Sequence, residues 1–156
     1  MSRADPFPAP TRKPMIGLVG LAHRKLRADM LREAHRRGHS FVKAAHNDVF
    51  ATLPLEGARA SDMAVRAGIT RQSMGEIIRD LVDLDLLEMQ TDPADGRAKI
   101  VTFSERGREF TRDGYQHILD LESRFADELG AEAYETARRV LEGIVAILER
   151  EEKVGE

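Results

Sequence analysis

Residues 61–103 have the sequence SDMAVRAGITRQSMGEIIRDLVDLDLLEMQTDPADGRAKIVTF, and this stretch decides the fold. It opens with a short helical segment at 62–67, which Ser61 can cap and which Gly68 follows. A hydroxyl at the start, an acidic first position and a glycine just past the end are three agreeing boundary signals. After a tight turn, Thr70 can cap a second helix. Two short helices joined by a turn that contains glycine predict a helix-turn-helix.

The second helix of this pair has one apolar and one polar face. Its apolar positions are Met74, Ile77, Ile78, Leu81, Val82 and Leu84. The polar positions gather at the N-terminal end, which is the end that probes base edges in helix-turn-helix proteins. Arginine pairs well with guanine and glutamine with adenine. We therefore expect DNA contacts from Thr70, Arg71, Gln72, Ser73, Glu76 and Arg79, the alternative being an ordinary solvated helix face.

A β-hairpin follows directly, with strands expected at 86–90 and 98–103 and a turn-rich tip at 91–97. A hairpin placed immediately after a helix-turn-helix is a wing, so 58–103 is predicted to be a winged helix-turn-helix. Arg97 at the tip can enter the minor groove of DNA, with Asp95 orienting its guanidinium. We also expect Lys99 to contact DNA. The alternative is an Asp-Gly turn with a solvent-facing arginine.

Helices are expected on both sides of this motif. Apolar residues recur at three- and four-residue steps from 15 to about 37, where Gly38 ends the helix. Ser40 can cap a second helix that runs to Phe50. Ser104 can cap a long helix that runs to about 129, and Gly130 breaks it before a last helix at 131–151.

The whole pattern predicts a mainly α fold with one small β-hairpin, as a single domain over 15–156. Residues 1–14 contain four prolines and are expected to form a flexible arm. The last helix carries an apolar stripe made of Tyr134, Ala137, Leu141, Ile144 and Leu148. A last helix has little of its own domain left to pack against, so this stripe favours a core shared between two subunits.

Composition narrows the class of protein. The chain has 156 residues and no cysteine, which excludes disulfides, thiolate metal sites and thiol switches. No apolar run approaches the roughly 20 residues of a membrane span, and residues 1–14 lack a secretory apolar core, so we expect a cytoplasmic protein. No nucleophile–base pairing, phosphate-binding loop or acidic metal cluster appears, and we therefore expect neither an enzyme nor a cofactor.

The formal net charge of −3 is unusual for a nucleic-acid binder, but the charge is unevenly distributed. Residues 1–40 carry nine Lys or Arg against three Asp or Glu, whereas residues 104–156 carry eight against fourteen. A DNA-binding protein needs positive charge only on the surface that meets phosphates. The basic run at 24–37 is expected to pair with the acidic C-terminal helices across a dimer rather than to bind DNA.

At this point the sequence resembles the MarR (multiple antibiotic resistance) family of winged-helix regulators. The resemblance is carried by SDMA at 61–64, TRQSM at 70–74, DPADGRA at 92–98 and VTFSERG at 101–107. It implies a homodimer with interlocked terminal helices, whose two winged units bind a pseudo-palindromic operator in double-stranded DNA. It further implies a transcriptional regulator, in the first place a repressor, that releases DNA when a small phenolic or otherwise lipophilic ligand binds.

Three positions depart from the family pattern. Gly75 and Glu76 stand where many relatives have a polar and a basic residue, and Asp85 stands where a glycine is common. Gly75 either allows close approach to DNA or only loosens the helix. Glu76 repels phosphate but can accept a hydrogen bond from a cytosine amino group. Glu76 and the net charge favour a different function, a winged-helix module that binds another protein without operator binding.

Histidines at 35, 39 and 46 raise the question of a metal site, because a four-residue step puts two side chains on one helix face. Gly38 interrupts that face, and no acidic or thiol ligand stands beside the histidines. We expect hydrogen-bonded or partly exposed histidines near a helix junction and no metal. The residues that would bind an effector cannot be picked out from the sequence.

Overall fold

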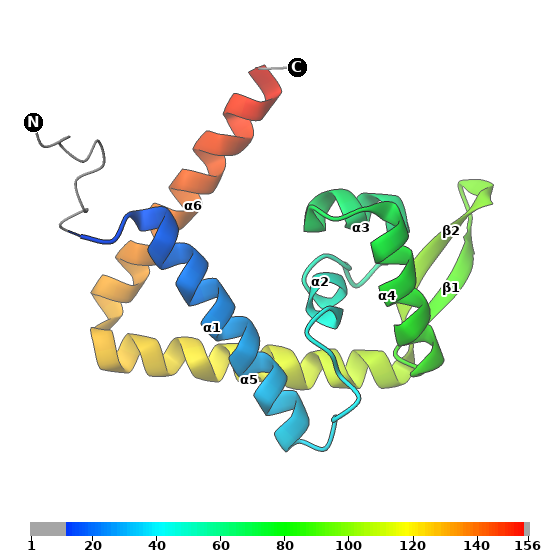
Figure 1. Cartoon of the computed structure of the whole chain (residues 1–156), viewed down its shortest axis with the longest axis horizontal. Coiled ribbons are helices and arrows are strands. Elements are labelled where there is room, and N and C mark those ends of the chain that lie inside the picture. Colours follow the sequence, from blue (N-terminus) through cyan, green and yellow to red (C-terminus); the bar gives the residue numbers. More distant parts are fainter. Residues whose placement is uncertain (1–11, 155–156) are drawn as a thin grey trace, which may run out of the picture. The chain divides into compact units, whose positions relative to one another are not determined.

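The structure is a computed structural model that describes residues 12–154, so nearly all of the expected arm at 1–14 lies outside the described residues. The order of elements is helix, helix, helix, helix, hairpin, helix, helix (Figure 1). They are α1 (Met15–Arg36), α2 (His46–Phe50), α3 (Ala60–Ala67), α4 (Arg71–Asp83), β1 (Leu87–Asp92), β2 (Asp95–Phe103), α5 (Glu105–Leu129) and α6 (Ala131–Val154). The predicted fold class, mainly α with one small hairpin, is confirmed.

The described residues divide into two compact units, and the boundary between Thr111 and Arg112 lies inside α5. The first unit holds α1 to α4, the hairpin and the first turns of α5. The second unit holds the rest of α5 and α6. No described helix is both long and apolar enough to cross a membrane.

The core of the first unit lies between α2, α3, α4 and the hairpin. Its buried residues are Val49, Leu53, Met63, Ala64, Met74, Ile78, Leu81, Leu86, Leu87, Val101 and Phe103. Met74, Ile78 and Leu81 recur at steps of four and three, which places them on one face of α4. This is the predicted apolar face. Ile77, Val82 and Leu84, also predicted for it, are half-buried at its border.

The hairpin is antiparallel and longer than the sequence predicts. Leu87 pairs with Phe103 at its base, Thr91 pairs with Lys99, and Asp92 pairs with Asp95 at the tip. The expected seven-residue tip therefore shrinks to a turn at Pro93 and Ala94, because side chains of the two aspartates accept backbone hydrogen bonds within it.

A third segment joins the hairpin from the chain ahead of α3. Ala58 and Val101 exchange two backbone hydrogen bonds, of 3.0 and 2.9 Å. Gly57 makes this approach possible: its φ is +94°, and a β-carbon there would lie 2.7–2.8 Å from Thr102, Ile100 and the Val101 carbonyl oxygen. The entry to α3 is thus anchored on β2.

Two predicted helix starts are wrong. Ser40 caps nothing, because turns at 40–41 and 44–45 take the place of the expected helix start and α2 begins only at His46. Ser61 lies inside α3 and donates a hydrogen bond to Asp62, since the bridge at Ala58 keeps Arg59 extended and makes it the residue before the helix. The other boundaries hold within a few residues, with Gly68 in the left-handed region at φ +65° after α3.

Candidate nucleic-acid interface

The start of α4 is built by Thr70, as predicted. Its hydroxyl oxygen accepts a hydrogen bond from the backbone N–H of Ser73 at 3.0 Å. The Ser73 hydroxyl lies 2.8 Å from the same oxygen. This cap satisfies one of the free N–H groups of the first turn, while Thr70 and Ser73 both stay exposed. The two hydroxyls thus lie together at the end of the helix that was predicted to contact bases.

The remaining side chains predicted for this face of α4 are exposed. The Gln72 amide donates a hydrogen bond to Glu76 at 3.1 Å, one turn further on. Arg79 extends back along the helix, so that a β-carbon on Gly75 would lie 3.6 Å from its guanidinium. Among the described residues, no hydrogen bond or ion pair engages Arg71. The structure therefore brings the predicted residues of α4 onto one exposed surface, with Gln72 and Glu76 already paired.

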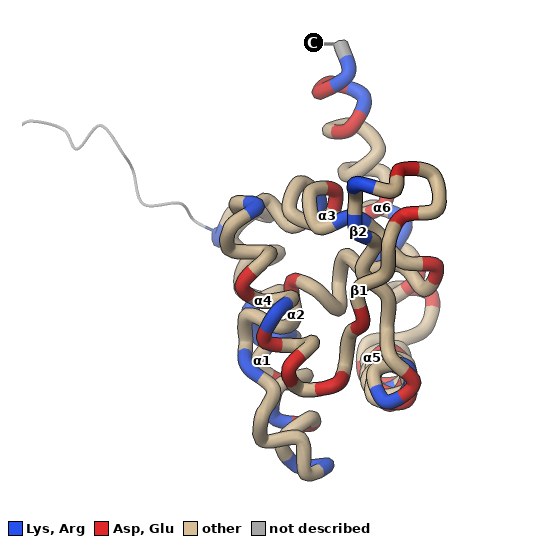
Figure 2. Tube along the Cα trace, turned by 90° about the vertical axis from the view of Figure 1, so that its right-hand side faces the viewer, with Lys and Arg blue, Asp and Glu red and all other residues tan. Residues whose placement is uncertain are grey.

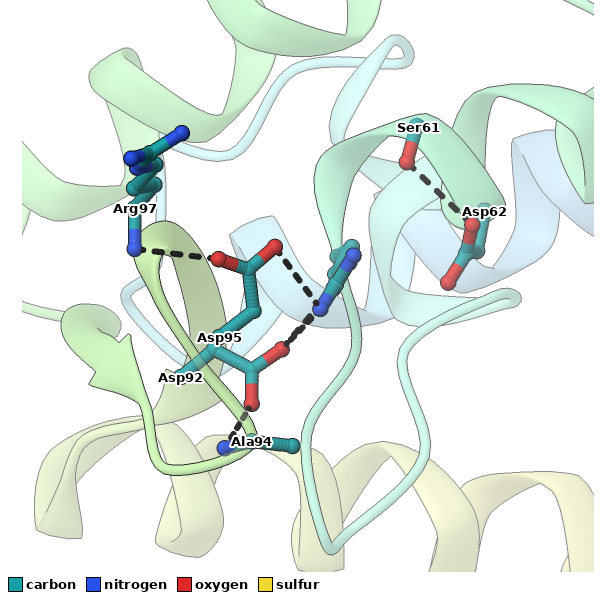
Figure 3. Close-up of polar contacts among 7 residues, drawn as sticks. Ser61, Asp62, Asp92, Ala94, Asp95 and Arg97 are labelled. Atoms are coloured by element: carbon teal, nitrogen blue, oxygen red, sulfur yellow. Dashed lines mark hydrogen bonds and ion pairs between the residues drawn. The ribbon is translucent and has the colours of Figure 1, made fainter.

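The two basic residues of the wing, Lys99 and Arg97, differ in their hydrogen bonds. Lys99 donates a hydrogen bond to the Thr91 hydroxyl across the hairpin at 3.0 Å. Arg97 is exposed at the tip, and its guanidinium makes no hydrogen bond with any part of the chain that the structure describes. The Asp95 carboxylate does not orient that guanidinium as expected. It accepts instead from the backbone N–H of Arg97 at 3.2 Å (Figure 3).

Arg59, which sequence reasoning missed, contacts both aspartates of the hairpin turn, Asp92 and Asp95. Its Nε donates to the Asp92 carboxylate at 2.9 Å, a terminal nitrogen of its guanidinium donates to the same oxygen, and that nitrogen lies 3.6 Å from Asp95. The other Asp92 oxygen accepts from the Ala94 N–H at 2.8 Å (Figure 3). That backbone hydrogen bond, and then Arg59, lower the pKa of the Asp92 carboxyl. No local pattern pointed to Arg59, because its partner lies 33 residues away.

The middle of α4 is joined to α2 through Asp80. One carboxylate oxygen of Asp80 lies 2.7 Å from the Lys43 ammonium and 2.7 Å from Nε2 of His46, which is only 1% exposed. Nδ1 of His46 accepts from the Lys43 backbone N–H at 3.2 Å, so the ring proton is on Nε2 and is donated to Asp80. Lys43, and then His46, lower the pKa of Asp80.

The histidines are thus used as hydrogen-bonding and packing groups. His35 hydrogen-bonds the Val42 carbonyl at 2.8 Å, and the ring of His39 lies edge-on to Phe41 and Phe110. No group of three metal-ligating side chains occurs among residues 12–154.

Part of the basic run of α1 forms ion pairs within the chain, and its pairing with the C-terminal helices across a dimer stays a prediction. Arg27 forms an ion pair with Asp48 of α2 at 2.7 Å, and Arg36 and Arg37 both pair with Glu33. The hydrogen bonds from these two arginines lower the pKa of Glu33 to about 2. Figure 2 shows the mixture of basic and acidic residues along α1.

Comparison with known proteins extends this picture. No family model matches the chain. An uncharacterised protein of Mycobacterium tuberculosis is 25% identical over 134 residues, which are 86% of this chain and 89% of the relative. The HTH-type transcriptional regulator TcaR of Staphylococcus aureus is 24% identical over 105 residues, which are 66% of this chain and 70% of TcaR.

Solved structures with the same fold include MarR of E. coli in its apo form, at a TM-score of 0.68 and 15% identity over 85% of this chain and 98% of that one. The MepR–DNA complex of S. aureus has a TM-score of 0.68 at 14% identity, covering 88% and 99%. The transcriptional repressor CouR, bound to a 23-mer DNA duplex, has a TM-score of 0.67 at 18% identity, covering 85% and 92%. The chain has the fold of the MarR-family winged-helix transcriptional regulators.

Proposed function

We propose that this protein is a sequence-specific regulator of transcription that binds double-stranded DNA through α4 and the wing. The observation that carries the proposal is that one compact unit exposes the capped start of α4 together with an unengaged arginine, Arg97, on a hairpin tip. A helix start of this kind fits the major groove, and a hairpin arginine fits the adjacent minor groove. Relatives support the proposal, since MepR and CouR were solved with DNA.

The charges of the unit are compatible with this role although the chain is acidic overall. Arg71, Arg79, Arg97 and Lys99 supply positive charge on α4 and the wing. Glu76 opposes them, but its hydrogen bond from Gln72 positions its carboxylate as an acceptor, which suits a cytosine amino group. We propose that Thr70 and Ser73 contact phosphates and that Asp95 acts on the wing backbone.

We also propose a homodimer, because the terminal helices expose large apolar side chains that one chain does not cover. On α6 these are Val140, Leu141, Ile144, Val145, Ile147 and Leu148, each between 37% and 53% exposed. On α1 they are Met15, Ile16, Leu18, Val19 and Leu26. Apolar helix faces of this extent are buried by association in water. Two winged units related by a two-fold axis then match a pseudo-palindromic operator.

The dimer is tested by placing a charge in the apolar face of α6. The double substitution Ile144→Glu and Leu148→Glu is expected to shift the mass in sedimentation equilibrium or light scattering from dimer to monomer. Arg150→Glu introduces an acidic residue at a polar, exposed position of the same helix and is expected to leave the mass unchanged. A wild-type chain that is monomeric at micromolar concentration would overturn this part of the proposal.

DNA binding is tested by fluorescence anisotropy with a labelled duplex taken from the region upstream of the protein's own coding sequence. Arg97→Ala is expected to weaken binding tenfold or more, whereas Arg150→Ala removes an equal charge on α6 and leaves the affinity unchanged. Equal affinity of the wild type for a scrambled duplex would contradict sequence specificity. Unchanged affinity of Arg97→Ala at physiological salt would remove Arg97 from the interface.

A second candidate function is a protein-interaction module, favoured by the net charge of −3 and by Glu76 on the reading face of α4. The fluorescence anisotropy measurement with the labelled duplex, repeated at low salt, separates the two functions. Because electrostatic contacts with phosphates strengthen as salt falls, a DNA-binding protein must bind at low ionic strength. No binding to any duplex at low salt would favour the interaction module.

The repressor role and release by a small ligand complete the proposal. We expect a phenolic or otherwise lipophilic compound to bind the free dimer more tightly than the DNA-bound dimer and so to release the operator. Adding a panel of phenolic acids to the preformed complex tests this expectation. A fall in anisotropy at concentrations that leave the CD spectrum unchanged supports release, and a constant anisotropy across the panel opposes it for that class of compound.

A further inference from the structure

We infer that Arg59 is a positioning residue of the wing, which holds the turn at 92–95 in the conformation that presents Arg97 to DNA. The inference deepens the proposed function and rests on it. Arg59 stands immediately before α3, on the helix-turn-helix side, and its partners stand at the tip of the hairpin. One side chain therefore connects the two parts of the proposed interface.

The contacts of Arg59 reach the two residues that close the hairpin. Nε and a terminal nitrogen both donate to one oxygen of Asp92, and the same terminal nitrogen lies 3.6 Å from Asp95. Asp95 in turn accepts the backbone N–H of Arg97 at 3.2 Å. A continuous set of contacts thus runs from Arg59 through Asp95 to the backbone of Arg97.

Because the Asp92 carboxylate is buried, the conformation of the turn depends on the positive charge of Arg59. The Asp92 side chain is 7% exposed, and its second oxygen is already used by the Ala94 N–H. A carboxylate at such a site needs a counter-charge, and removal of the partner leaves a buried charge uncompensated. Without Arg59, the carboxylates of Asp92 and Asp95 would face each other without a cation between them, which favours opening of the turn.

The backbone of Arg59 is held in place by its neighbour in the chain. The residue before it, Ala58, is bonded to Val101 by two backbone hydrogen bonds, and Arg59 adopts an extended conformation next to that bridge. An isolated two-stranded hairpin is only marginally stable in water. By tying its tip to the α3 junction, Arg59 removes conformational freedom from Arg97 before DNA arrives, which lowers the entropic cost of binding.

Direct contact of Arg59 with a phosphate is the competing explanation, because its side chain is 41% exposed. The variant Asp92→Asn separates the two roles. If Arg59 positions the wing, Asp92→Asn loosens the turn and weakens DNA binding, although it removes a negative charge. If Arg59 contacts phosphate, the same change frees the guanidinium and removes repulsion, so binding becomes tighter.

The decisive measurement is a double-mutant cycle by anisotropy on the full chain with the upstream duplex. We expect Arg59→Gln to weaken binding about tenfold, and to cause less than a twofold further loss in an Arg97→Ala background, because it acts through Arg97. Losses that multiply in the double variant would overturn the inference. Arg150→Gln, the matched exposed arginine on α6, is expected to have no effect.

A readout without DNA completes the test. Amide hydrogen exchange at Gly96 and Arg97 is expected to be faster in Arg59→Gln than in the wild type, with unchanged exchange in α4. Unchanged exchange at the tip would overturn the inference even if affinity fell. If Arg59→Gln does not fold, Arg59→Lys takes its place in the cycle, since it keeps the charge and loses the paired N–H donors. Failure of the wild type to bind any duplex would instead refute the proposed function.

Discussion

Gly107 of α5 and Leu86 ahead of β1 are in backbone contact: a β-carbon on Gly107 would stand 1.9 Å from the Leu86 carbonyl oxygen. That oxygen also accepts from the Ser104 N–H at 3.2 Å, and the Ser104 hydroxyl accepts from the Gly107 N–H at 2.9 Å. The first turn of α5 is therefore seated on the residue that begins the wing. Only glycine permits this approach.

Gly107→Ala is expected to destabilise the first unit, because the new methyl group meets backbone that cannot rotate away. Overpacking of this kind costs about 2 kcal/mol. We expect a fall in melting temperature of about 4 °C or more at equal protomer concentration, measured by CD or calorimetry. A melting temperature equal to that of the wild type would show that α5 can shift away from Leu86 without cost.

Gly75→Ala is expected to stabilise the protein, in contrast to Gly107→Ala. Gly75 is inside α4, and its added β-carbon would meet only Arg79, at 3.6 Å. Alanine favours the helix by about 1 kcal/mol relative to glycine, so urea unfolding should move to higher denaturant. The DNA affinity of the same variant decides its role: a loss indicates close approach to DNA, and no loss indicates a glycine that only loosens the helix.

Asp85→Gly is expected to stabilise the protein. Asp85 is the only non-glycine among the described residues with positive φ, at 57°, and its contacts are made by its backbone, which donates to Val82 and accepts from Ser104. Glycine adopts this conformation without a β-carbon clash, but it also makes the unfolded chain more flexible. The net gain in the free energy of unfolding is about 0.5–1 kcal/mol. Asp83→Gly, at the last residue of α4, should lower stability instead.

Asp80 is expected to contribute to stability above its ordinary titration range and to lose that contribution in acid. Lys43 and His46 lower its pKa in the folded state, so folding favours the ionised form. The contribution is complete above the unfolded pKa, near 4, and decreases as pH falls through the lower folded pKa.

The measurement is the melting temperature of wild type and Asp80→Asn from pH 7 to pH 2.5. We expect the variant to be less stable at neutral pH and the two curves to converge in acid. Curves that stay parallel over this range would show that Asp80 does not titrate with folding. Asp92 and Glu33, which also have lowered pKa values, are present in both proteins and cancel in the difference.

Features that depend on neighbours in the chain were predictable. Thr70 caps α4 because hydroxyl and N–H lie three residues apart, and Gly68 ends α3 because it adopts a left-handed conformation that other residues avoid. The face of α4 follows from its periodicity in the same way. Ser61 and Ser40 show the limit of such signals, since a competing contact at Ala58 moved one helix start and turns replaced the other.

Local sequence thus determined the helix-turn-helix, its cap and the hairpin, because the interactions that form them span only a few residues. Tertiary structure alone decided how these parts are held: Arg59 with Asp92, His46 with Asp80, and Gly107 against Leu86. Their partners lie 33, 34 and 21 positions apart in the chain. Such pairs form only after the core has folded, since their energy depends on burial and mutual geometry rather than on residue type.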